Sequence, residues 1–204
     1  DPDLQYNLST PLMCASENGH VDVVRLLLEA SAQTDLGDSH RGETALMDAA
    51  GGGHSQVVQL LLEAGAQKDL RDLENSTALM YAAFNGRDAV VRLLLEAGAE
   101  KDLCDEDGRT ALMDAASEGH VAVVQVLLEA GAQKDVQDNV GGTALMTSAF
   151  TGQSPVVQLL LEASADKDVR DDYGKTALVY AAEHQCNDVQ RLLEATANAS
   201  RADA

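Results

Sequence analysis

Three histidines are the first residues whose type and spacing could bind a metal ion. His20, His54 and His120 each precede an apolar stretch, at the same point of three similar segments of the chain. A metal site needs several ligands within about 2 Å of one ion, whereas this pattern supplies one histidine to each segment. We therefore predict no metal ion, and we interpret the histidines as capping or hydrogen-bonding residues.

The acidic run Asp105–Gly108 is similar to part of a calcium-binding loop. An EF-hand loop has aspartate five residues before its glycine, and this chain has Leu103 at that point. The run is therefore interpreted as a turn, in which Gly108 supplies the positive φ that a tight turn needs.

The sequence suggests neither nucleophilic catalysis nor phosphate binding. Gly51–Gly53 ends a helical pattern, whereas a phosphate loop opens a helix after a strand. Cys14, Cys104 and Cys186 lie in segments too distant for a disulfide, because packed helices are about 8–10 Å apart. We therefore predict no catalytic residue, no cofactor, three free thiols and a reducing compartment, the cytoplasm.

The elements that carry these residues repeat along the chain. The stretch Asp105–Lys134 contains a turn, a short helical pattern, a second helical pattern and the glycine stop Gly131. A threonine that is suited to cap the first helix recurs every 33 or 34 residues, as Thr10, Thr44, Thr77, Thr110, Thr143 and Thr176. One such pair of helices cannot bury its apolar faces alone, whereas a stack of pairs can.

These units resemble ankyrin repeats, which have about 33 residues, a turn, two helices and a Thr-Pro-Leu-His opening. Thr10-Pro11-Leu12 keeps three letters of that opening, and the later units read Thr-Ala-Leu-Met or Thr-Ala-Leu-Val. The resemblance implies an all-α fold, an ankyrin-repeat solenoid of stacked helix-turn-helix units with hairpin-like turns, as one domain over residues 1–204. Methionine replaces the family's histidine, and we predict that this column packs between repeats: Met13, Met47, Met80, Met113 and Met146.

The two ends of the repeat array differ in polarity. The last unit has Gln190 and Glu194 where the earlier units have valine and leucine. A terminal repeat needs a polar outer face, so we predict that the last unit is a C-terminal cap. The first unit keeps its apolar residues, including Val23 and Leu26, and we expect its outer face to be less well protected.

The charge of the chain limits the choice of partner. It has 14 basic and 34 acidic residues and a formal net charge of -20, so nucleic acid is not expected to bind. The charge either serves solubility alone or favours a basic partner, and both interpretations stay open. No apolar run approaches the roughly 18 residues that span a membrane, so we expect no membrane insertion.

Aromatic residues mark the candidate binding surface. Tyr81 and Tyr180 follow their threonine by four residues, and Phe84 and Phe150 follow theirs by seven, on the face opposite the leucine and alanine stripe. The resemblance implies that this face and the turn tips line a concave groove, where family members commonly bind partners. The predicted partner-binding residues are Tyr81, Phe84, Asp114, Ser117, Glu118, Thr147, Phe150, Tyr180, Tyr173 and Asp48.

The leading functional hypothesis is a non-catalytic scaffold, monomeric on its own, that binds a protein segment with apolar anchors and basic residues. Two alternatives remain: a regulatory segment of a larger enzyme, and a structural subunit of a large assembly. For the scaffold, we expect truncation of Tyr81 or Phe84 to weaken binding with little change in folding, and charge reversal at Asp114 to alter the association rate.

Overall fold

The computed structural model describes residues 3 and 9–202, with the side chains described up to residue 195, and it places twelve helices in this part of the chain. The chain falls into two compact units, Asp1–Glu106 and Asp107–Ala204. That residues 1–204 form a single domain stays a prediction, and the two units are described one at a time. We use "repeat" for a turn with the two helices that follow it, and name each repeat by its first helix.

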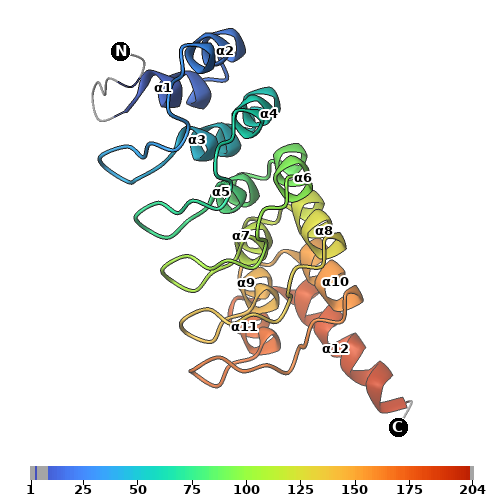
Figure 1. The fold of residues 1–204 in the computed structure, drawn as a ribbon. Helices are drawn as coiled ribbons and strands as arrows, with labels where there is room; N and C mark the ends of the chain where they lie inside the picture. Colours follow the sequence, from blue (N-terminus) through green and yellow to red (C-terminus); the bar gives the residue numbers. More distant parts are fainter. Residues whose placement is uncertain (1–2, 4–8, 203–204) are drawn as a thin grey trace. The chain divides into compact units, whose positions relative to one another are not determined.

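The first unit contains three repeats. Their helices are α1 (Pro11–Glu17), α2 (Val21–Glu29), α3 (Ala45–Gly52), α4 (Ser55–Glu63), α5 (Ala78–Phe84) and α6 (Asp88–Glu96). The first helices, α1, α3 and α5, pack on one another as an inner row, and α2, α4 and α6 form an outer row. Hairpin-like turns project from the side of the inner row (Figure 1).

The second unit repeats this arrangement. Its helices are α7 (Ala111–Glu118), α8 (Val121–Glu129), α9 (Ala144–Phe150), α10 (Ser154–Glu162), α11 (Ala177–Glu183) and α12 (Asn187–Ala202). Here α7, α9 and α11 are the inner row, and α8, α10 and α12 are the outer row. The predicted fold class, an all-α stack of helix pairs with hairpin-like turns, is confirmed.

The threonine column caps the inner helices. The Thr10 hydroxyl accepts a hydrogen bond from the Met13 N–H at 3.2 Å, and the Met13 sulfur accepts one from the Thr10 N–H at 3.3 Å. The threonine side chain accepts the same bond in every repeat except the last, where Thr176 makes no side-chain cap bond. The methionines are almost completely buried, as predicted for a packing role. The Met47 sulfur also accepts the Thr44 N–H, at 3.4 Å.

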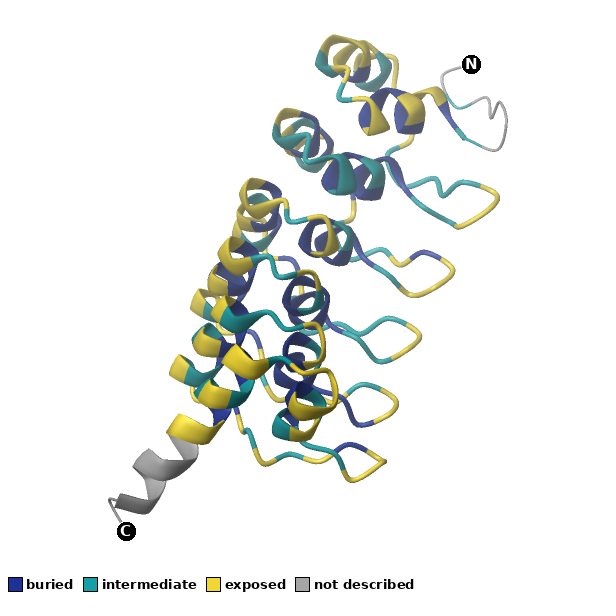
Figure 2. Ribbon diagram, turned by 180° about the vertical axis from the view of Figure 1, so that it is seen from behind, coloured by how far each residue is buried: buried dark blue, intermediate teal, exposed yellow. Residues whose placement is uncertain are grey.

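The core lies where neighbouring helices meet (Figure 2). Leu61, Leu94, Leu127 and Leu160, one from each of four successive outer helices, have no exposed surface. Exposed residues gather on the outward side of the outer row and at the turn tips. Each repeat therefore depends on its neighbours for the burial that stabilises it.

The first and last repeats differ in the polarity and exposure of their outer helices. Glu194 is exposed, Gln190 is half-buried, and the Gln190 amide donates a hydrogen bond to Glu194 at 3.0 Å. At the other end, Val23 is 46% exposed, whereas Val57 at the same repeat position is 0% exposed. The first repeat therefore presents an apolar face that an outer helix covers in the next repeat.

None of the helices in the described part of the chain combines the length and the hydropathy that a transmembrane segment requires.

The matched valines give a test of this end-to-end asymmetry. We expect Val57→Ala to lower the free energy of unfolding by about 2 kcal/mol, since it opens a cavity in a filled core. Val23→Ala makes the same change at the same repeat position and should cost under about 0.5 kcal/mol, because the side chain is half in water. Urea unfolding of both variants measures the difference. Equal losses would show that the first repeat is as well covered as the second.

Candidate functional site

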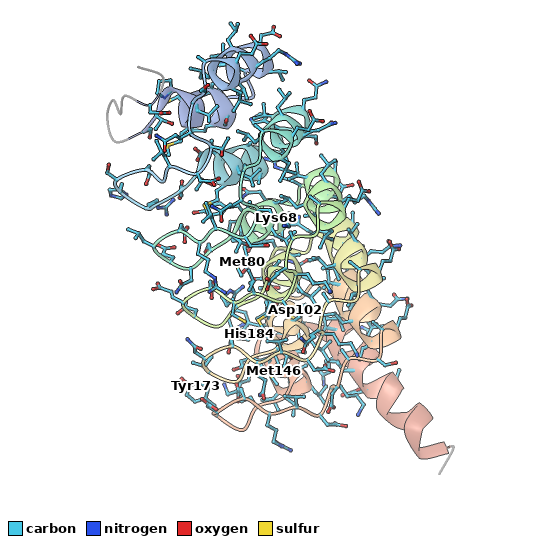
Figure 3. All side chains as sticks on the ribbon, viewed as in Figure 1. Lys68, Met80, Asp102, Met146, Tyr173 and His184 are labelled. Atoms are coloured by element: carbon cyan, nitrogen blue, oxygen red, sulfur yellow. The ribbon has the colours of Figure 1, made fainter. Side chains whose placement is uncertain are left out.

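The predicted binding residues lie on the exposed side of the inner row and on the turns, which we call the inner face of each unit. Phe84 is 52% exposed and Phe150 is 47% exposed, although both belong to inner helices. Tyr173 is largely exposed in a turn (Figure 3). Tyr6, a further turn aromatic of the sequence, lies outside the described residues.

In the first unit, Tyr81 is tied to the turns by its hydroxyl group. The oxygen lies 2.7 Å from Glu43 Oε1 and 2.8 Å from Asp72 Oδ2. Burial and these two carboxylate contacts raise the pKa of the Tyr81 phenol far above its ordinary value. Asp72 in turn accepts the N–H groups of Glu74 and Ser76 at 2.9 and 2.7 Å. Tyr81 is therefore part of the turn architecture, and the expectation that its truncation leaves folding nearly unchanged is not supported.

Asp48, also in the first unit, has only acidic residues as its charged neighbours. No described residue forms a hydrogen bond or an ion pair with its carboxyl group. Burial, followed by the negative charges of Glu43, Glu17 and Asp38, raises its pKa to about 7. At neutral pH the group is therefore near its titration midpoint, and a nearby cation would favour the charged form.

Asp114 occupies the same repeat position in the second unit, with the opposite surroundings. Arg109 precedes Asp114 by five residues, as Glu43 precedes Asp48. The Arg109 Nη2 atom lies 3.0 Å from Asp114 Oδ1. Asp114 is buried, so it is not the exposed steering charge that the sequence suggested. Glu118, one turn further along α7, is exposed.

The second unit contains a pocket of about 280 Å³ on its inner face. Its walls bring together four of the predicted residues, Ser117, Thr147, Phe150 and Tyr180, from three successive inner helices. The other predicted residues of this unit, Asp114, Glu118 and Tyr173, do not line it. The helical periodicity of the sequence predicted that these four residues share one face. The packing of α7, α9 and α11 forms the pocket on that face.

Seven further residues that the sequence did not point to also line this pocket, namely Arg109, Asp138, Val140, Gly142, Met146, Thr151 and Asp171. Val140 is an exposed apolar side chain in a turn, three residues before Thr143, and Tyr173 stands at the same distance from Thr176. An apolar residue at this turn position in two repeats is the sequence pattern that could have identified Val140 as a binding residue. Met146 is a buried core residue whose contact with the pocket no sequence pattern shows.

Aromatic contacts hold one wall of the pocket. The Phe150 and Tyr180 rings meet edge to face with centroids 6.0 Å apart, and the His184 ring lies 4.1 Å from Phe150. The Tyr180 hydroxyl donates a hydrogen bond to Asp171, and this bond, with burial, raises the pKa of Tyr180 to about 12. The wall is therefore a set of rings in fixed orientations, which suits an apolar or aromatic group.

The residues first considered for chemistry have local structural roles. His54 Nε2 lies 2.8 Å from the carbonyl oxygen of Glu17, which supports the hydrogen-bonding interpretation, but the side chains of His20, His54 and His120 cap no helix. The three cysteines are unpaired. In the described ranges, no set of histidine, cysteine and carboxylate side chains is arranged to hold a metal ion.

Asp48 predicts a pH-dependent stability. Its folded pKa of about 7 lies above the ordinary value of 3.8, so between these limits the folded protein keeps a proton that the unfolded chain releases. The contribution of Asp48 to the free energy of unfolding therefore falls as the pH rises from about 4 to about 7. We expect Asp48→Asn to reduce that fall by about 1 kcal/mol or more, measured by urea unfolding at pH 5 and pH 8.

Asp114→Asn is the matched control for this measurement. It removes the carboxylate that pairs with Arg109, so it should destabilise the protein at both pH values instead of relieving repulsion at pH 8. Loss of stability at pH 8 in the Asp48→Asn variant would contradict the interpretation of Asp48 as a carboxylate among like charges.

Comparison with known families agrees with this architecture. A sequence model of the family described as ankyrin repeats matches the chain in three stretches, residues 1–72, 65–138 and 130–203. A search of curated proteins gave no significant match. The matched stretches together include all twelve helices of the described residues, and the resemblance noted in the sequence is confirmed. The chain therefore belongs to the ankyrin-repeat family.

Proposed function

We propose that this protein is a non-catalytic interaction module, which binds a segment of a partner protein on the inner face of its repeats. The observation that carries the proposal is the ring-walled pocket of the second unit, lined by Phe150, Tyr180, Val140 and Met146. Proteins of this family generally bind other proteins, and solenoids do so along extended repeat surfaces.

Exposed apolar side chains support a protein partner. Phe150 and Phe84 are about half exposed on inner helices, and Leu73, Val140 and Tyr173 are exposed in the turns. Moving a large apolar side chain from water into an interface is favourable. Aromatic residues are also enriched among interface hot spots. An extended partner segment that contacts helices and turns together would cover such residues.

Charge supports a partner segment that carries basic residues. The chain has a formal net charge of -20. Asp48 is surrounded by Glu43, Glu17 and Asp38 in the first unit, and Glu118 and Glu183 are exposed on inner helices of the second. A lysine or arginine brought to these carboxylates gains their attraction and speeds association.

Truncation of the exposed phenylalanines tests the proposal. We expect Phe150→Ala or Phe84→Ala to weaken partner binding by about 2 kcal/mol, because each removes an exposed ring that a partner would bury. Quantitative co-precipitation would identify a partner, and titration calorimetry with that partner would then give the affinities.

The control is Gln125→Ala on the outer row, where Gln125 is exposed and its side-chain amide donates a hydrogen bond to Glu129 at 2.9 Å. This change should leave the affinity unaltered. An affinity that is lost with Gln125→Ala and kept with both phenylalanine variants would place the interaction on the outer row and refute the proposal.

A further inference from the structure

Two repeats show how a tyrosine closes the inner face. Tyr81 and Tyr180 stand four residues after the capping threonine, and the aspartates Asp72 and Asp171 stand five residues before it. In each repeat the tyrosine hydroxyl bonds to Oδ2 of the aspartate, while Oδ1 holds the N–H groups of the turn. The aspartates are only 7% and 6% exposed as a result.

The α9 repeat has the same aspartate but no tyrosine. Asp138 Oδ1 accepts the N–H groups of Val140 and Gly142 at 3.0 and 2.7 Å, so the turn is built in the same way. Thr147 occupies the tyrosine position, and its hydroxyl donates to the Ala144 carbonyl at 3.0 Å instead of reaching the turn. No described residue donates a hydrogen bond to Asp138 Oδ2, and Asp138 is only half-buried.

The pocket lies where the missing tyrosine would be. In the first unit, Tyr81 packs near Gly51: its Cδ1 atom lies 3.7 Å from where a Cβ on Gly51 would be. The Tyr81 hydroxyl also donates a hydrogen bond to Glu43 of the preceding repeat. In the α7 repeat, which precedes the α9 repeat, Ser117 occupies the position of Gly51 and Arg109 occupies the position of Glu43. Both residues line the pocket. Asp138, Thr147 and Phe150 of the α9 repeat complete the outline.

The size and polarity of the pocket favour one aromatic side chain. Its volume of about 280 Å³ lies at the lower limit of small-molecule sites, roughly 300–1,000 Å³. Phe150 and Met146 offer apolar contact to a ring, and Asp138 Oδ2 offers an acceptor to a group at the end of that ring. Asp138 and Asp171 would repel a carboxylate or a phosphate.

We propose that this pocket receives a tyrosine side chain of the partner protein, with its ring against Phe150 and Met146 and its hydroxyl donating to Asp138 Oδ2. The assignment rests on the proposed function and makes it more specific. The partner's tyrosine completes the α9 repeat as Tyr81 and Tyr180 complete their own repeats, and the Arg109 guanidinium, which also lines the pocket, can donate to the phenol oxygen.

The experiment uses p-cresol, which has the size and hydroxyl of a tyrosine side chain, and toluene, which lacks the hydroxyl. Each is titrated into the 204-residue chain, and the backbone amides are followed by NMR. We expect p-cresol to shift the amides of Gly142, Met146, Thr147 and Phe150, and toluene to bind about fivefold more weakly or worse, since it leaves the carboxylate unpaired.

Two variants at one position provide the controls. T147Y places a phenol in the pocket from the chain itself, with the geometry of Tyr180, and should abolish the shifts caused by p-cresol. T147V has nearly the volume of the native threonine and should keep them. An amide spectrum of each variant without ligand shows whether it is folded, and the wild-type comparison of p-cresol with toluene tests the proposal without any variant.

Three results would overturn the assignment: no shifts at the pocket amides with p-cresol, equal binding of toluene, or unchanged p-cresol binding in T147Y. Because the titration needs no partner, its failure is separate from failure of the proposed function. A pocket without phenol selectivity would leave the affinity losses expected for Phe150→Ala and Phe84→Ala unaffected.

Discussion

The packing of each helix pair against the next is the constraint on which the rest of this structure depends. One pair of helices with short apolar stripes cannot exclude water from both sides, so the leucines of the outer helices are fully buried only where a neighbouring repeat covers them. The same requirement fixes the methionine column, which is almost completely buried in the inner row. Substitutions in these columns would open cavities, so variation concentrates on the inner face and the turns.

The residue four positions after the capping threonine, together with the residue just before that threonine, sets what five of the repeats present on that face. A tyrosine bonds the turn aspartate and closes the surface, as Tyr180 does with Asp171. Asp114 is neutralised by Arg109 of its own repeat, whereas Asp48 is left among carboxylates. Thr147 is too short to reach Asp138, and a pocket remains. These two positions thus yield a closed surface, an ion pair, a negative centre or a cavity, on repeats that share the same pair of helices.

The turns connect this variation to the rigid part of the fold. Asp72, Asp138 and Asp171 each accept backbone N–H groups of their own turn with one carboxylate oxygen, as Asp138 does at 3.0 and 2.7 Å. The second oxygen is available to a side chain of the inner helix or to a partner. A binding surface built this way is preorganised, because the acceptor is held in place before any ligand arrives.

The sequence by itself determined the period, the helix pairs, the threonine caps, the buried methionines and the polar last repeat, since each depends on contacts that recur at a fixed spacing. It also placed Ser117, Thr147, Phe150 and Tyr180 on one face, because that follows from helical periodicity alone. It did not show that Tyr81 is bound into the turns, that Asp114 is buried against Arg109, or that Asp138 lines a pocket. Those facts depend on how far each side chain reaches across to a turn or to the preceding repeat. Only the packed structure sets those distances, because residues 5 to 38 positions apart meet there through the stacking of repeats and the path of the turns.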